Sequence, residues 1–179
     1  MIAQTFVAQQ SSIEVLDLSN GHLLYSFAQS QAAQPDGVVV SEDGSLLAEG
    51  STASTWNGND SFVVHRLPGG AVVTQIGGGG AVAFSSDNTR VLTVQYLNGS
   101  NQAGMYRVVD LATSRVVWSA VMSPGTHLTR PGGGDFLIAS WTYEPSTSRP
   151  NGADSFEDVW LVPTDGSARM LLKHVVPVD

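Results

Sequence analysis

The chain has 179 residues, no cysteine, a net charge of −8, and 42% hydrophobic against 13% charged residues. The missing cysteines exclude disulfides, thiolate catalysis and cysteine-based metal sites. The single lysine and the scattered arginines form no basic cluster of the kind that nucleic-acid phosphates require, and the acidic balance disfavours anionic membranes. We therefore expect neither nucleic acid nor a membrane among the partners.

The N-terminal stretch, MIAQTFVAQQSSIEV, has no basic n-region and no long apolar segment. It therefore predicts neither a signal peptide nor a membrane-spanning helix, and it leaves the compartment open.

Short apolar runs that alternate with period two predict strands along the whole chain. The first unit has three such runs, at about 4–9, 12–18 and 22–28, and the turn sequence Ser19-Asn20-Gly21 separates the last two. Asx-Gly and Pro-Gly pairs suit tight hairpins because they allow positive φ angles. This unit therefore contains strands b, c and d of a repeat, without a strand a.

Three complete units follow, each with predicted strands a, b, c and d. The predicted strands are about 38–41, 45–50, 61–66 and 71–76; then 81–85, 90–96, 105–110 and 115–121; and then 127–130, 136–142, 158–163 and 168–173. The four glycines at 77–80 fall at a crossover between units, where we expect a tight backbone. The repeat spacing of about 44–50 residues is typical of a propeller blade, a four-stranded antiparallel sheet.

These units predict one all-β domain, a β-propeller of about four blades over 1–179. The predicted blade units are 1–30 plus 174–179, 31–76, 77–121 and 122–173. Pairing of 174–179 with the first unit would close the ring through the two termini. Three arrangements stay open: a closed ring of four blades, a fragment of a longer propeller, and a half-ring that a second copy completes as a homodimer.

Several segments resemble known propeller repeats. DLSNGHLLYSF, RVVDLATSRVVWSA and VAFSSDNTRVLTV are similar to the hairpins of WD-repeat and YVTN-type propellers, and DVWLVPTDGSARMLL is similar to TolB-type repeats. The resemblance implies that Asp43, Asp87 and Asp110 shape turns. Propellers of these families include scaffolds, translocation proteins, peptidase gates and quinoprotein-like enzymes, so the fold alone does not select a function.

The connections between strands b and c, at about 51–60, 97–104 and 143–157, are predicted to be longer than the other turns and to share one face of the propeller. Long loops on a rigid scaffold are where binding usually resides. We therefore predict that this face binds a protein or peptide partner. The candidate partner-binding residues are Trp56, Asn57, Asn98, Tyr143, Arg149 and Asn151.

No pattern for catalysis accompanies these loops. The sequence lacks a G-x-S-x-G elbow, its four histidines are dispersed, and its polar loop clusters do not match calcium-loop spacing. We expect no catalytic residue, no metal and no cofactor, and we expect His65 to be a surface or hydrogen-bonded histidine. The predicted function is non-enzymatic protein or peptide binding. The alternatives are an accessory propeller of a larger enzyme, such as a prolyl-type peptidase, and a small-ligand or quinoprotein-like propeller.

Overall fold

The computed structural model shows a chain built from strands. It describes residues 2–7, 10–17, 19–28, 38–50, 61–97, 104–122, 127–129, 135–145, 153–163 and 165–175. Within these ranges the backbone forms fifteen strands in four antiparallel sheets and no helix. The predicted all-β architecture of antiparallel blades is confirmed.

Each sheet is made by one consecutive stretch of the chain. The first sheet has the order β1–β2–β3, with β1 (Ile2–Val7), β2 (Gln10–Leu16) and β3 (Leu23–Ala28). The second contains β4 (Val38–Val40), β5 (Leu46–Gly50), β6 (Ser61–Arg66) and β7 (Ala71–Gly77). The third contains β8 (Gly80–Phe84), β9 (Arg90–Tyr96), β10 (Gly104–Asp110) and β11 (Val116–Met122). The fourth contains β12 (His127–Thr129), β13 (Phe136–Pro145), β14 (Ala153–Val162) and β15 (Arg169–Val175).

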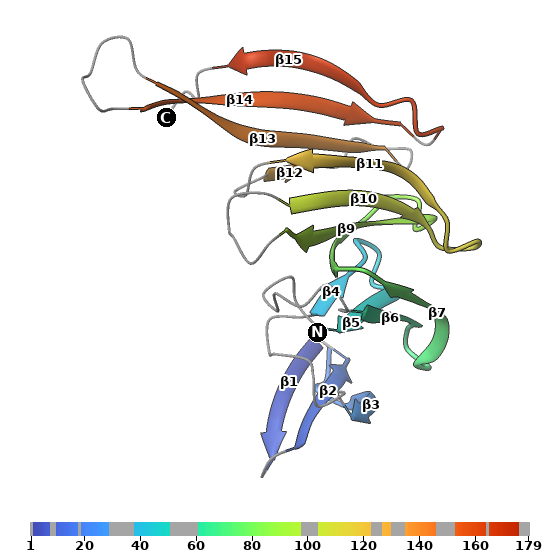
Figure 1. The fold of residues 1–179 in the computed structure, drawn as a ribbon. Helices are drawn as coiled ribbons and strands as arrows, with labels where there is room; N and C mark the ends of the chain where they lie inside the picture. Colours follow the sequence, from blue (N-terminus) through green and yellow to red (C-terminus); the bar gives the residue numbers. More distant parts are fainter. Residues whose placement is uncertain are drawn as a thin grey trace.

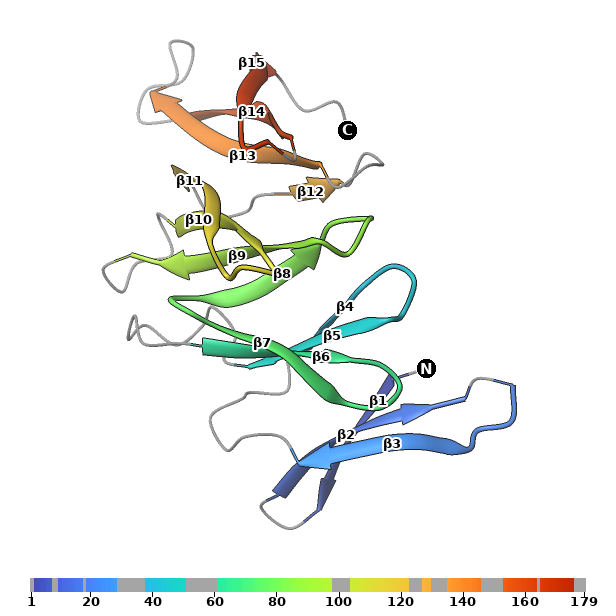
Figure 2. The same cartoon turned by 90° about the vertical axis from the view of Figure 1, so that its right-hand side faces the viewer.

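The four sheets follow one another as a stack in chain order. Figures 1 and 2 show the first sheet at one end and the fourth at the other, with the second and third between them. Side chains of the second sheet pack against the third sheet, and those of the third pack against the fourth. This is the blade-on-blade arrangement of a propeller.

The second and third sheets share a hydrophobic core. Its buried side chains come from both sheets because successive residues of a strand point to opposite faces. Leu46, Ala48, Phe62, Val64 and Ile76 come from the second sheet, and Phe84, Val91, Val109 and Leu111 come from the third sheet and its turn.

A second core lies between the third and fourth sheets. Leu92, Val94, Tyr106, Val108 and Met122 meet Phe136, Ile138 and Val162 there, and Trp118 and Trp160 pack against them. The third sheet is therefore buried on both faces. Val91 of β9 packs in the first core, and its neighbour Leu92 packs in the second.

The turns between strands a and b are held by one repeated hydrogen-bond network. The Ser41 hydroxyl donates to Asp43 Oδ1 at 2.8 Å and accepts from the Leu46 N–H at 2.9 Å. In the next blade the Ser85 hydroxyl donates to Asp87 Oδ1 at 2.7 Å and accepts from the Arg90 N–H at 3.0 Å. Aspartate suits this position because its short side chain bonds to backbone two residues ahead.

Asp43 also links the second sheet to the third. The amide of Asn88, in the following a–b turn, donates to Asp43 Oδ2 at 2.7 Å and to Ser45 Oγ at 3.0 Å. The backbone N–H of Ser45, the Asn88 amide and the Ser41 hydroxyl together hold the pKa of Asp43 well below its usual range. The carboxylate is therefore ionised and committed to structure at neutral pH.

The c–d hairpins also repeat their geometry. The pairing register shifts after Val15, Val64 and Val108, which are equivalent positions of β2, β6 and β10. One turn residue of each unit has a positive φ angle, namely Gly21, Gly70, Ser114 and Gly166. Asp17, Asp110 and Asp165 accept hydrogen bonds from the residues of their own turns. The inference that Asp43, Asp87 and Asp110 shape turns is confirmed.

One sequence expectation needs correction. The loop expected at about 143–157 is mostly strand, because Thr142 to Pro145 of β13 continue to pair with Phe156 to Ala153 of β14. The segment 174–179 is expected to pair with the first unit. His174 and Val175 form the end of β15, and 176–179 lie outside the described residues, so closure of the ring through the termini stays a prediction. Among the described residues, β1 pairs with β2 alone.

Candidate functional site

The structure tests little of the predicted binding face. Trp56, Asn57, Asn98, Arg149 and Asn151 lie outside the described residues. Tyr143 was predicted to lie in a loop, but its backbone belongs to β13, opposite Ser155 of β14. Pairing to Pro145 is favourable because each further residue of the hairpin satisfies backbone hydrogen bonds.

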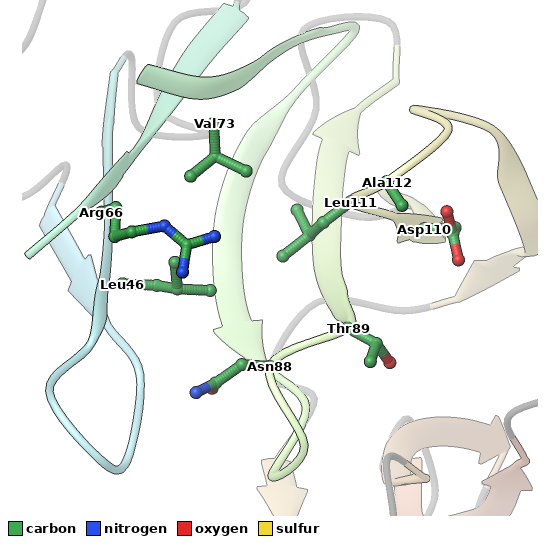
Figure 3. Close-up of a pocket in the computed structure, with 8 residues that line it drawn as sticks. All are labelled: Leu46, Arg66, Val73, Asn88, Thr89, Asp110, Leu111 and Ala112. Atoms are coloured by element: carbon green, nitrogen blue, oxygen red, sulfur yellow. The ribbon is translucent and has the colours of Figure 1, made fainter. Parts of the chain in front are cut away.

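The described residues contain a cavity at the opposite ends of the strands. It has a volume of about 320 Å³ and lies between the second and third sheets, where the a–b and c–d turns meet. Its apolar lining is Leu46, Val73, Leu111 and Ala112, and its polar lining is Arg66, Asn88, Thr89 and Asp110. Figure 3 shows Leu46, Val73 and Leu111 pointing toward one another, with the Arg66 guanidinium between Val73 and Leu46.

The polar groups of this cavity differ in how far they are already bonded. Asp110 accepts hydrogen bonds from the backbone N–H of Thr113 at 2.9 Å and from its hydroxyl at 2.7 Å. The Thr89 hydroxyl donates to Asp87 at 2.9 Å. Arg66 is exposed, and within the described part of the chain its guanidinium has no hydrogen bond or ion pair. Within the described residues, the cavity therefore has one cationic side chain without a partner, Arg66, next to its apolar lining.

A buried ionisable pair lies on the other face of the second sheet. Glu49 and His65 are 7% and 8% exposed, and His65 Nε2 lies 3.8 Å from Glu49 Oε1. His65 Nδ1 lies 3.1 Å from the Gly70 carbonyl oxygen, to which it donates. The expectation of a hydrogen-bonded histidine is thus correct, but His65 is buried rather than on the surface. Its ring lies close to the first sheet, because Gly70 is tightly packed against Tyr25 of β3.

Burial raises the pKa of the Glu49 carboxyl, and the nearby His65 opposes that rise. Glu49 Oε2 is buried and has no hydrogen-bond partner. A buried carboxylate oxygen without a donor favours the protonated form. The folded domain therefore gains stability from protonated Glu49. This gain is fully present below the ordinary pKa of glutamate and is lost as the pH rises through the raised pKa of the folded state.

Glu49→Gln is therefore expected to stabilise the domain at pH 7.5. The neutral amide avoids burial of a charge, and we expect Tm to rise by roughly 2–4 °C, the change that about 1 kcal/mol gives in a chain of this size. Thermal unfolding monitored by circular dichroism should show this gain shrinking as the pH falls through the raised pKa of Glu49, and it should be gone below the ordinary glutamate pKa of 4.5, where the carboxyl is protonated in the folded and unfolded states alike. Glu42→Gln, at an exposed turn glutamate, is the control and should change nothing. A lower Tm for Glu49→Gln at pH 7.5 would mean that the ion pair with His65 dominates.

Neither a metal centre nor a membrane-spanning helix is found within the described ranges. No cluster of three or more His, Asp or Glu side chains there is arranged to hold a metal ion. No helix within those ranges is long and apolar enough to cross a membrane. The predicted absence of a metal, a cofactor and catalysis remains a prediction.

Comparison with known proteins supports the fold. No protein-family model matches the chain, and no curated protein matches its sequence. Among solved structures, the β-propeller domain of the Trilobed protease from Pyrococcus furiosus aligns over 97% of this chain and 53% of its own, at 12% identity and a TM-score of 0.61. Acylaminoacyl peptidase from Pyrococcus horikoshii aligns over 93% of this chain and 28% of its own, at 14% identity and a TM-score of 0.60.

Hydrazine synthase from Kuenenia stuttgartiensis also aligns, over 90% of this chain and 47% of its own, at 17% identity and a TM-score of 0.59. The chain thus spans about half, or less, of the lengths of these structures. At such low identity the likeness concerns the fold alone. The fold is a β-propeller in which this chain supplies consecutive blades, and the resemblance to particular propeller repeat families remains a resemblance in sequence.

Proposed function

We propose that this chain is a non-enzymatic propeller segment that binds a protein or peptide through its b–c face. The observation that carries the proposal is a difference between the two ends of the blades. The a–b and c–d turns, such as 41–45 and 67–70, are short and internally hydrogen-bonded. The b–c connection 51–60 is longer and contains Trp56 and Asn57. Aromatic side chains on connections between rigid strands suit partner binding.

The carboxylates at the short turns support the same proposal. Asp43, Asp87, Asp110 and Asp165 each accept hydrogen bonds within their own turns. Their hydrogen bonds lower their pKa values, so they hold the backbone as ionised acceptors. A general acid or base would instead need a pKa near neutrality. These acidic residues therefore serve the scaffold.

Trp56→Ala is expected to weaken partner binding and leave stability nearly unchanged. Peptides would first be selected on the wild-type domain from a displayed random library and then synthesised with a fluorescent label. Fluorescence anisotropy should show at least tenfold weaker binding to Trp56→Ala, because a tryptophan anchor commonly contributes that much. Arg149→Ala tests the same face in another blade.

Glu42→Ala is the matched control, since Glu42 is exposed in an a–b turn at the other end of the blades. It should bind the selected peptides like the wild type. Equal loss in Glu42→Ala and Trp56→Ala, or a large drop of Tm in Trp56→Ala, would contradict the proposal. The second result would assign Trp56 to the core.

A second candidate function is that of an accessory propeller in a larger enzyme. It is supported by the names of two similar structures, a protease and an acylaminoacyl peptidase, each longer than this chain. Sequencing of the reading frame on both sides of this segment tests it. A peptidase domain in the same frame would support this candidate, and its absence would favour the stand-alone binding module. Completion of the ring by a second copy likewise remains a prediction.

A further inference from the structure

The cavity between the second and third sheets lies at the opposite end of the blades from the proposed partner-binding face. Residues at the start of β5, at the end of β6, in the turn before β9 and in the turn after β10 line it. A volume of about 320 Å³ is at the lower end of the range for small-ligand pockets. Any ligand of this cavity would therefore be independent of Trp56 and the b–c connections.

The apolar part of the lining indicates which apolar group a ligand would place in the cavity. Leu46 and Leu111 are 4% and 6% exposed and belong to the shared core, so their positions are held by the packing of two sheets. Val73 of β7 packs against the same core from the outer side. Figure 3 shows these three side chains around one space. A branched aliphatic group the size of a leucine or valine side chain would bury its surface against them.

Arg66 indicates which charged group the ligand would carry. The other charged groups near the cavity are committed: Asp43 to Asn88 and its own turn, and Asp110 to Thr113. Figure 3 shows the Asp110 carboxylate on the far side of Leu111 from the Arg66 guanidinium. Arg90, nearby in sequence, donates to the Pro163 carbonyl oxygen at the next sheet junction. The charge that this cavity offers to a ligand is therefore the guanidinium of Arg66, whose planar fork fits a carboxylate.

We propose that this cavity binds the C-terminal residue of a peptide, with its aliphatic side chain among Leu46, Val73 and Leu111 and its carboxylate on Arg66. A C-terminal leucine or valine carries both groups close together on one residue. The rest of the peptide continues into solvent, because the cavity is bounded by exposed turns such as that at Ala112. The acidic balance of the whole chain, at −8, does not by itself attract a carboxylate, so recognition depends on the one local cation.

The test uses the full chain and the probe acetyl-Ala-Ala-Ala-Leu with a free carboxylate. In a titration followed by methyl NMR, the methyl signals of Leu46, Val73 and Leu111 should shift. The same peptide as its C-terminal amide should bind about tenfold more weakly or worse, because it lacks the charge that pairs with Arg66. 3-Methylbutanoate, which has the same two groups but no peptide, should bind more weakly than the peptide acid.

Three variants and one control sharpen the result. Arg66→Gln should abolish the preference for the acid over the amide, and Arg66→Lys should restore part of it. Ala112→Leu, which adds bulk at the exposed rim, should weaken binding of both forms. Arg169→Gln removes the same charge from an exposed position of β15 and should bind like the wild type.

Equal affinity for acid and amide, or shifts of other methyl groups only, would overturn the proposal. Binding of 3-methylbutanoate as tight as that of the peptide acid would overturn the assignment to a peptide. Trp56→Ala should leave these titrations unchanged, so failure here and failure of the b–c face are distinguishable.

Discussion

Replacing Val108 with aspartate is expected to unfold the domain. Val108 is fully buried in the core between the third and fourth sheets, beside Tyr106, Phe136 and Ile138. An aspartate there would bury a carboxylate that no described side chain of this core can pair with. We expect a loss of more than about 4 kcal/mol, which is a large part of the stability of a typical domain.

Val116→Asp is the matched control. Val116 lies on β11, one strand outward from Val108, and is 53% exposed. Its replacement should change the free energy of unfolding by only about 0.5 kcal/mol. Urea denaturation followed by circular dichroism compares the two variants. Wild-type-like unfolding of Val108→Asp would show that the assignment of faces along β10 is wrong.

Gly79→Ala is expected to destabilise the crossover between the second and third sheets by about 3 kcal/mol or more. Gly79 has a φ angle of +143°, where residues with side chains are strained. A Cβ atom at this position would lie 2.5 Å from the Val94 carbonyl oxygen, and that backbone atom is held in β9. Strain of this kind alone costs about 1–3 kcal/mol, and the clash with backbone adds to it.

Gly77→Ala, two residues earlier in the same run of glycines, should be nearly neutral. A Cβ atom there meets no other atom within 4 Å, and Gly77 is exposed at the end of β7. We expect a change within about 1 kcal/mol in either direction. Thermal melting of the two variants side by side is the measurement. Equal effects would mean that this crossover does not require the backbone conformation described for Gly79.

Most of the strands could be predicted from the sequence, because their signals are local. Alternating apolar residues and Asx-Gly or Pro-Gly turns place 61–66 and 90–96 at the bounds that β6 and β9 have in the structure. The turn roles of Asp43, Asp87 and Asp110 follow from the same local chemistry. The error at 143–157 also has a local origin. Pro145 and the polar residues around it are typical of a loop, but Pro145 is the last residue of β13 and pairs with Ala153 of β14.

The cavity and the buried pair could not be found in this way. Arg66 and Asp110 occupy equivalent turn positions of successive repeats, and nothing in either repeat shows that one is free and the other hydrogen-bonded. Glu49 and His65 are polar residues of strands, and the period-two pattern around them indicates solvent as readily as a neighbouring sheet. Only the stacking of one sheet on the next determines which of these faces is covered.

The sequence by itself determined the repeat, the strands and the turn residues of this protein, because hairpins depend on side chains that are close in the chain. The tertiary structure decided what lies between the blades: the cores around Phe62 and Val108, the bond from Asn88 to Asp43, the burial of Glu49 and His65, and the cavity beside Arg66. Those features join residues from different sheets. Their energies depend on contacts and desolvation across tens of residues, which no local pattern encodes.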